Sequence, residues 1–330
     1  MPVNRMSDVS SIRFTRNIQP VDRTRLQQDV QKYIERSQAP HSRRAYQADW
    51  RDFASWCETN RFQALPSSPE TVAAYITDLS ERHYKTSTIA RRISSISIAH
   101  QAKKWESPTH TLTVRAVWRG IRRERGVMPQ PKDALLADDI RKIVSSIDTS
   151  TLRGLRDRAV ILVGYAGAFR RSELVSVDLE HVEFREDGLV ITIRRGKTDP
   201  DGEGRRIAIV HGRNPETCPV RALKTWIDEA WVLEGPVFRK VNKSDNVESR
   251  RLTDQAIATI VKRCALRAGL DPDPFAGHSL RSGFATQAAM NGTTELDIMR
   301  QTGHRSLTTV RRYIREGNLF RDNPSGNIGL

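Results

Sequence analysis

The segment Gly126–Lys132 constrains this chain more than any other feature, because it divides the sequence into two parts that fold separately. Its sequence, G-V-M-P-Q-P-K, contains two prolines and a glycine, which cannot continue the helical pattern before it. A chain of 330 residues also suits two domains of about 100–200 residues each better than one. We expect a disordered tail at 1–20, a helical domain at 21–126, a linker at 127–134, a second domain at 135–317 and a C-terminal tail at 318–330.

The part before the break has the period of amphipathic helices and carries no strand signal. Tyr46, Trp50 and Phe53 recur at spacings of three and four residues, which places them on one helix face. Ser68 followed by Pro69 is a helix cap with proline at the first helical position. We expect helices at about 22–36, 42–57, 69–80, 86–100 and 111–125.

The part after the break is helical except for one region in which the period changes to two. The apolar run A-V-I-L-V-G-Y-A within a helix predicted at 152–168 is expected at the centre of the core. Three short alternating segments predict antiparallel strands at 181–186, 188–194 and 205–210. The other helices are expected at about 138–147, 219–231, 253–268 and through 275–317. The predicted fold is therefore mainly α with a small antiparallel β-sheet.

Positive charge is concentrated in the first domain and indicates a polyanionic partner. The net charge is +15, and residues 1–126 supply +10 of it from 22 Lys and Arg against 12 Asp and Glu. Arg115, Arg119 and Arg122 recur at four and three residues, so they share one face of the predicted helix. Such a stripe fits a phosphate track, and a solvated surface face is the alternative. The candidate DNA-binding residues are Arg43, Arg44, Lys85, Arg91, Arg92, Arg115, Arg119, Arg122 and Arg123.

Several classes of protein are disfavoured by the composition. No run approaches the ~18 apolar residues of a membrane span, and the N-terminus has no apolar signal region. Cys57, Cys218 and Cys264 are odd in number and far apart, which argues against a disulfide framework or a zinc site. The acidic residues are scattered rather than clustered, so we predict neither a metal centre nor a cofactor. We expect a cytoplasmic protein, associated with the nucleoid in a bacterium, that does not bind a membrane.

Reactive side chains gather in the stretch Phe275–Gly317, which contains His278, Arg281, His304 and Tyr313. Cleavage of a phosphodiester without a metal requires a nucleophile, cations that hold the phosphate oxygens, and an acid for the leaving oxygen. Tyrosine, with a pKa of ~10, is a weak nucleophile that neighbouring cations can activate. Arginine suits the clamp because its guanidinium forks onto two oxygens. For Tyr313 alone, a half-buried packing role is the alternative.

The other members of such a site lie earlier in the second domain. Arg170 follows the apolar helix, and Glu173, three residues later, is placed to orient it. Lys197, in the loop between the second and third predicted strands, is the candidate acid, because arginine does not release a proton in practice. Structural ion pairs are the alternative for the arginines, and a surface position is the alternative for Lys197.

Four sequence matches resemble the tyrosine site-specific recombinases, or phage integrase family, and most nearly its compact Cre-type members. A-F-R-R-S-E-L resembles the first-arginine box, with Arg170 as the clamp and Glu173 as its supporting acid. The loop with Lys197 lies where the family has its catalytic lysine. Ala168-Phe169 departs from the glycine and leucine that many members have there. The N-terminal arm-type domain of lambda-type integrases is not expected.

The remaining two matches come from the C-terminal stretch, and the resemblance covers about residues 27–318. H-S-L-R is similar to the family's H-x-x-R box, at His278 and Arg281. G-H-R-S-L followed by Y-I-R places His304 nine residues before Tyr313, which is the family spacing. The helical first domain is similar to the core-binding domain of the family.

This resemblance implies that Tyr313 attacks the scissile phosphate and forms a 3′-phosphotyrosine without metal or ATP. The implied helpers are Arg170, Arg281 and His304 on the non-bridging oxygens, His278 for proton movement at the nucleophile, and Lys197 for the leaving oxygen. The implied partners are double-stranded DNA with a short inverted-repeat target and three further copies of the chain, in a homotetramer on two DNA sites with a Holliday junction as intermediate. The alternatives are a type IB topoisomerase-like relaxase and a non-catalytic sequence-specific DNA-binding protein.

Overall fold

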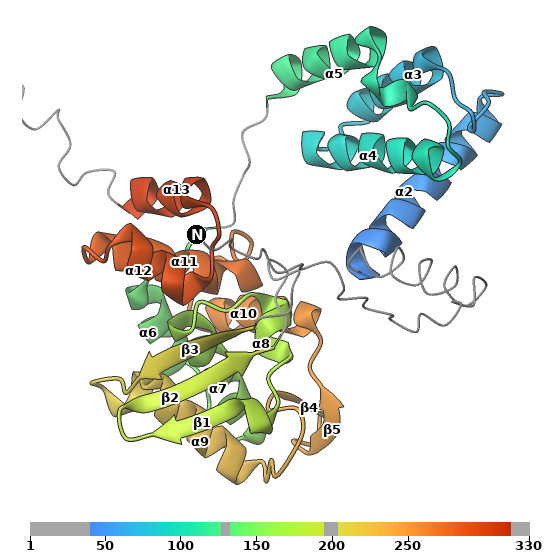
Figure 1. The fold of residues 1–330 in the computed structure, drawn as a ribbon. Helices are drawn as coiled ribbons and strands as arrows, with labels where there is room; N and C mark the ends of the chain where they lie inside the picture. The colour runs from blue at the N-terminus through green and yellow to red at the C-terminus, as the bar shows by residue number, and fades with distance from the viewer. Residues whose placement is uncertain (1–39, 127–132, 195–203, 318–330) are drawn as a thin grey trace, which may run out of the picture. The chain divides into compact units, whose positions relative to one another are not determined.

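The computed structural model describes residues 40–126, 133–194 and 204–317 (Figure 1). The chain separates into two compact units, with the division between Pro129 and Gln130. Both predicted tails, the helix predicted at 22–36, most of the predicted linker and the loop that holds Lys197 lie outside the described residues. None of the helices in the described ranges has the length and hydropathy needed to span a lipid bilayer.

The described part of the first unit consists of helices packed around a hydrophobic core. Its described elements are α2 (Pro40–Thr59), α3 (Pro69–Glu81), α4 (Thr86–Ala102), a 3₁₀ turn (Pro108–His110) and α5 (Leu112–Arg125). Ser68 caps α3, because its Oγ accepts a hydrogen bond of 3.2 Å from a backbone N–H of the first turn. Phe53 and Tyr75 are fully buried in the core. The predicted helices in the described ranges are confirmed, although α2 begins at Pro40 rather than at Ser42.

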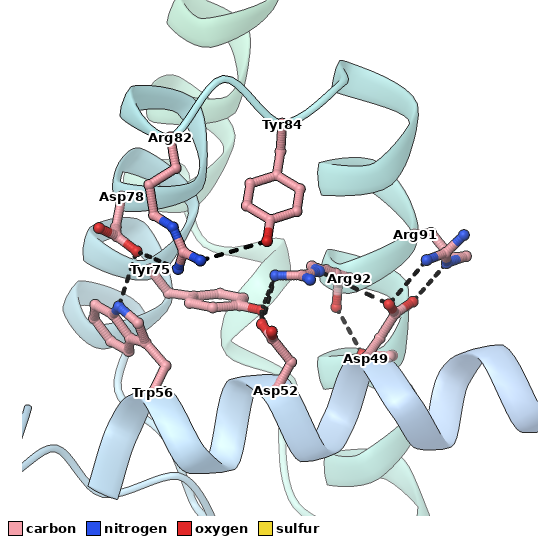
Figure 2. A network of polar contacts seen from close by, with 10 residues as sticks. Asp49, Asp52, Trp56, Tyr75, Asp78, Arg82, Tyr84, Arg91 and Arg92 are labelled. Carbon is pink, nitrogen blue, oxygen red and sulfur yellow. Dashed lines mark hydrogen bonds and ion pairs between the residues drawn. The ribbon is translucent and has the colours of Figure 1, made fainter. Parts of the chain in front are cut away.

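A network of ion pairs joins α2 to α4 in this unit (Figure 2). Asp49 accepts hydrogen bonds from Nε and Nη2 of Arg91 at 2.6 and 3.0 Å. Asp52 accepts from Nη1 of Arg92 and from the hydroxyl of Tyr75, each at 2.5 Å. Asp49 is 4% exposed and Arg92 is 8% exposed. Because a buried charge is costly once its partner is removed, these pairs specify how the two helices pack.

The second unit combines helices with two small antiparallel sheets. Its helices are α6 (Ala137–Ser145), α7 (Leu152–Ala166), α8 (Arg171–Val175), α9 (Pro219–Glu229), α10 (Asp254–Arg267), α11 (Gly277–Met290), α12 (Glu295–Thr302) and α13 (Leu307–Gly317). Its strands are β1 (Val182–Arg185), β2 (Gly188–Ile193), β3 (Arg205–Val210), β4 (Arg239–Val241) and β5 (Val247–Arg251). The first three strands form one antiparallel sheet, as predicted. Their order is β1-β2-β3, and β4 pairs with β5.

The predicted fold class is confirmed, but the prediction of a single sheet was wrong. Strand β4 has three residues, and β5 reads V-E-S-R-R, with charged side chains at three of its five positions. Neither segment shows the alternation of apolar and polar residues by which a half-buried strand is recognised.

Helix α7 lies at the centre of the second unit. Residues 159–163 are each at most 4% exposed, and the helix packs against α9 and α11. It ends at Ala166, earlier than predicted, because Gly167 is its C-cap and Ala168 has a φ of +49°. This left-handed residue ends the helix just before Arg170.

Helix α11 approaches the backbone at Leu135 so closely that glycine is required at position 283. A Cβ atom on Gly283 would lie 1.9 Å from the carbonyl oxygen of Leu135. The N–H of Leu135 also donates a hydrogen bond of 3.1 Å to the carbonyl oxygen of Ser279 in the same helix. The contact therefore joins two backbones, neither of which can move aside like a flexible side chain.

We predict that Gly283→Ala lowers the free energy of unfolding of the second unit by roughly 1–3 kcal/mol, because the added methyl group must displace backbone atoms. The matched control is Gly120→Ala in α5, where nothing lies within 4 Å of the added Cβ. That change should raise stability by about 1 kcal/mol, because alanine favours the helix. Denaturant titration measures both effects, and a neutral or stabilising Gly283→Ala would contradict the close approach.

Candidate active site

Helix α11 supplies two of the predicted site residues, one turn apart. The helix begins at Gly277, so His278 stands in its first turn and Arg281 follows one turn later. Arg281 is 1% exposed, and its Nη1 donates a hydrogen bond of 2.7 Å to the carbonyl oxygen of Ala168. Its Nη2 is buried without a hydrogen-bond partner in the described part of the chain. A buried guanidinium N–H without an acceptor is costly, so this atom indicates a site for an anion.

The turn after α7 supplies Arg170 and Glu173. Nη1 of Arg170 donates to Oε1 of Glu173 at 2.5 Å, and the backbone N–H of Arg170 donates to Oε2 at 3.0 Å. Glu173 is 2% exposed and also accepts a hydrogen bond of 2.9 Å from Nη2 of Arg205. One buried carboxylate therefore holds two arginines at the site.

The C-terminal helices bring the second histidine and the tyrosine to the same place. Gly303 ends α12 with a left-handed φ of +65°, and Nδ1 of His304 then lies 2.7 Å from Oγ1 of Thr302. The hydroxyl of Tyr313, on α13, lies 3.0 Å from Nε2 of His278. The ring centroids of His304 and Tyr313 are 5.9 Å apart. Two histidines from different segments thus flank one phenol.

Burial and nearby arginines keep both histidines neutral in the free protein. Desolvation by the groups packed around the ring, followed by Arg281 and Arg170, lowers the pKa of His278, although its side chain keeps an exposed surface. The same causes lower the pKa of His304 to about 3. An imidazole pKa is ordinarily ~6.5, so neither ring carries a charge at neutral pH. Nε2 of His278 is therefore able to accept the phenolic proton of Tyr313.

The phenol itself also keeps its proton in the free protein. Burial raises the pKa of Tyr313 and outweighs the arginines around it, of which Arg281 is the strongest in lowering it. The neighbouring arginines do favour the phenolate, as expected, but burial opposes them by more. Burial and Arg170 lower the pKa of Arg281 to about 9, so its guanidinium remains charged at neutral pH. Tyr313 requires a base, and His278 is in contact with it.

Six of the seven predicted catalytic residues come together at this site, namely Arg170, Glu173, His278, Arg281, His304 and Tyr313. The seventh, Lys197, lies outside the described residues. Arg205 and Thr302 also belong to the site, although neither was predicted. No local sequence pattern indicated Arg205, because Glu173, with which it pairs, lies 32 residues earlier. Thr302, two residues before His304, could have been found from that spacing.

Most of the candidate DNA-binding residues are exposed. The exposed residues are Arg43, Arg44, Lys85, Arg91, Arg115, Arg119, Arg122 and Arg123. Arg91 differs from the others, because Asp49 already binds its guanidinium. The prediction for Arg92 was wrong, since this side chain is 8% exposed and paired with Asp52 (Figure 2). Asp52 precedes Arg92 by 40 residues, so no local pattern revealed the pair.

We predict that the free energy of unfolding of the second unit decreases as the pH falls below 6.5. His304 has a pKa of about 3 in the folded chain against ~6.5 when unfolded, so the unfolded state takes up the proton first. Its stabilising contribution is complete above pH ~6.5 and is lost progressively toward pH 3. Denaturant titrations between pH 7 and 5 should show that His304→Asn loses less unfolding free energy over this range than the wild type does. The same change at the exposed His110 is the control, and equal slopes for both variants would contradict the assignment.

Comparisons with known proteins find a family model in each of the two parts of the chain. The family model described as phage integrase family matches residues 133–318. A second model, phage integrase N-terminal SAM-like domain, matches residues 30–107. An integrase/recombinase xerD homolog of Selenomonas ruminantium is 42% identical over 302 residues, covering 91% of this chain and 88% of that protein. Tyrosine recombinase XerD of Listeria monocytogenes serotype 4b is 27% identical over 288 residues, covering 85% of this chain and 89% of that protein.

Solved structures show the same fold at low sequence identity. The XerH site-specific recombinase bound to a palindromic difH substrate has a TM-score of 0.60 at 18% identity, covering 79% of this chain and 72% of that chain. A lambda integrase (75–356) dimer bound to a COC′ core site has a TM-score of 0.56 at 17% identity, covering 88% of this chain and 94% of that chain. With a family model over more than half of its length and a relative at 42% identity, the chain belongs to the phage integrase family and is a tyrosine recombinase.

Proposed function

We propose that this tyrosine recombinase cuts and rejoins duplex DNA at a specific site through a covalent 3′-phosphotyrosine. The observation that carries the proposal is the contact at Tyr313, whose hydroxyl lies 3.0 Å from Nε2 of the neutral His278. Arg281 adds a charged group with a buried N–H that has no partner among the described residues. A nucleophile, a base and an anion-binding cation therefore occur together, as phosphoryl transfer requires.

In the first step, His278 accepts the phenolic proton as Oη of Tyr313 attacks the scissile phosphorus. A P–O bond forms to the tyrosine, and the bond from phosphorus to the 5′ oxygen of the next nucleotide breaks. Lys197 donates a proton to that oxygen, which leaves as a 5′ hydroxyl. Arg170 and Arg281 hold the non-bridging oxygens, where negative charge gathers in the transition state.

The phosphate also changes the state of His304. A bound phosphate raises the pKa of this imidazole, in opposition to the burial and the arginines that lower it. Once protonated, His304 keeps Nδ1 on Thr302 and presents its Nε2–H to a phosphate oxygen. Bound DNA thus favours a further cation of the clamp at His304.

Rejoining reverses this step, with the 5′ hydroxyl of a second strand attacking the phosphotyrosine. The ester linkage is conserved throughout, so the exchange requires no ATP, and the arginine clamp takes the role that metal ions have in metal-dependent nucleases. Arg115, Arg119 and Arg122 on α5 supply contacts to the DNA backbone, and within the described residues no acid pairs with them.

The proposed assembly is four protomers on two inverted-repeat sites, with a Holliday junction as intermediate. The C-terminal tail, which lies outside the described residues, is proposed to dock on a neighbouring protomer. The proposed location is the cytoplasm of the host, at the nucleoid, because that is where the DNA substrate lies.

We predict that Tyr313→Phe forms no covalent adduct with a nicked suicide substrate and binds the same DNA with unchanged affinity. The reason is that the substitution removes the attacking oxygen and leaves the basic surface intact. Gel electrophoresis under denaturing conditions detects the adduct, and a mobility shift measures binding. The matched control is Tyr165→Phe, because the Tyr165 hydroxyl is buried without a partner in the described ranges. A persistent adduct in Tyr313→Phe would contradict the assignment of the nucleophile.

For Lys197→Ala, we predict cleavage slower by about 100-fold or more on normal DNA, because the leaving oxygen loses its acid. A substrate with sulfur in place of the 5′ bridging oxygen should restore most of the rate, since a thiolate leaves without protonation. Single-turnover kinetics on the two substrates measures the recovery. If the sulfur substrate gave no recovery, the acid would have to be another group.

A further inference from the structure

Arg205, the first residue of β3, lies among the catalytic side chains. Its Nη2 donates to Oε2 of Glu173 and its Nη1 donates to the carbonyl oxygen of Gln301, each at 2.9 Å. The guanidinium also lies against the end of α12, because a Cβ atom on Gly303 would be 2.8 Å from it. Arg205 thereby connects three segments, namely the start of β3, the turn with the first arginine and the end of α12.

These contacts suit Arg205 to position other groups rather than to hold the substrate. Both of its terminal nitrogens already face protein acceptors. Arg281, by contrast, keeps its Nη2 without a partner in the described part of the chain. Two N–H groups of Arg205 are thus committed to the protein, whereas the buried Nη2 of Arg281 gains an acceptor when a phosphate oxygen binds.

The carboxylate of Glu173 is divided between two arginines. Its Oε1 accepts from Arg170, and its Oε2 accepts from the side chain of Arg205. If Arg205 were absent, the negative charge of Glu173 would be offset by Arg170 alone, and that pair would carry no net charge. With Arg205 present, the three groups together carry one positive charge. Arg170 is then held in place and still attracts a phosphate.

The side chain of Arg205 also anchors the end of α12, from which the chain continues to His304 and Tyr313. Gln301, whose carbonyl oxygen accepts from Arg205, donates through its Nε2 to the carbonyl oxygens of Ala166 and Ala208 at 3.0 and 3.1 Å. The end of α12 is thus tied to both α7 and β3. His304 comes three residues after Gln301, so its position depends on the same contacts.

We propose that Arg205 is a positioning residue for DNA cleavage. It shares the carboxylate of Glu173 with Arg170, so that the three groups keep a net positive charge beside the phosphate, and it anchors the end of α12. This assignment rests on the proposed function, because its readout is the attack by Tyr313.

The first experiment measures single-turnover adduct formation on a nicked suicide substrate. Arg205→Gln should cleave about 100-fold more slowly than the wild type, because the clamp is misplaced. Its affinity for DNA should be unchanged, since no phosphate contact is removed. Arg205→Lys keeps the charge but reaches only one of the two acceptors, so it should recover part of the rate. The matched control is Arg206→Gln, the next residue, which contacts Glu183 at 3.2 Å and should cleave at the wild-type rate.

A pH profile separates positioning through Glu173 from a merely structural role. Burial raises the pKa of Glu173, but Arg205 and then Arg170 lower it by more, so the carboxyl stays ionised at neutral pH. In Arg205→Gln this pKa rises. Glu173 then becomes protonated, and releases Arg170, at a higher pH than in the wild type. The acid limb of the plot of cleavage rate against pH should therefore move to higher pH. Arg205→Lys should keep the acid limb near its wild-type position.

A double variant tests whether Arg205 acts through Glu173. If it does, the loss of rate in Glu173→Gln combined with Arg205→Gln should be smaller than the product of the two single losses, because both substitutions break the same contact. The lost bond to Gln301 should still make the double variant slower than Glu173→Gln alone. Three results would each overturn the assignment. They are a loss in the double variant equal to the product of the two single losses, an acid limb of Arg205→Gln that does not move, and a wild-type cleavage rate in Arg205→Gln. Absence of an adduct from the wild-type protein would instead contradict the proposed function and this inference together. If the wild-type protein forms the adduct and Arg205→Gln forms it at the same rate, this inference is contradicted and the proposed function is not.

Discussion

A single buried carboxylate holds the positive charges of this site together. Glu173 is 2% exposed and binds Arg170 and Arg205, and both arginines also influence the titration of Arg281. The positive charges of Arg170, Arg205 and Arg281 repel one another strongly where water is excluded. Glu173 offsets part of this repulsion, and a DNA phosphate is suited to offset the remainder. The buried Nη2 of Arg281, without a partner among the described residues, is the clearest sign of this incomplete balance.

The same charges determine the resting state of the reacting groups. In the free protein His278 and His304 are neutral and Tyr313 keeps its proton, because burial and the arginines disfavour charge on the imidazoles and burial disfavours the phenolate. A bound phosphate makes the local potential less positive, which raises the pKa of His304. Under the proposed function, bound DNA therefore moves the site toward its reactive state. This dependence on bound DNA limits the deprotonation of Tyr313 when no substrate is present.

Local patterns predicted most of the fold and of the site, and contacts distant in sequence account for what was missed. Ser68 indicated the start of α3, and the change to a period of two indicated β1–β3, because caps and periodicity act over a few residues. The boxes around Arg170 and His278 were recognisable in the same way. The ion pairs of Arg92 and Arg205 were not, because their carboxylate partners lie 40 and 32 residues earlier in the chain. Only folding brings those groups together.

The most direct test of this account is to identify the atom to which DNA becomes linked. The protein would be trapped on a nicked suicide substrate and digested with a protease, and the peptide that carries the nucleotide would be sequenced by mass spectrometry. The account predicts a 3′-phosphate ester on the hydroxyl of Tyr313 in α13, beside His278. A linkage to another residue, or through a 5′ phosphate, would contradict it.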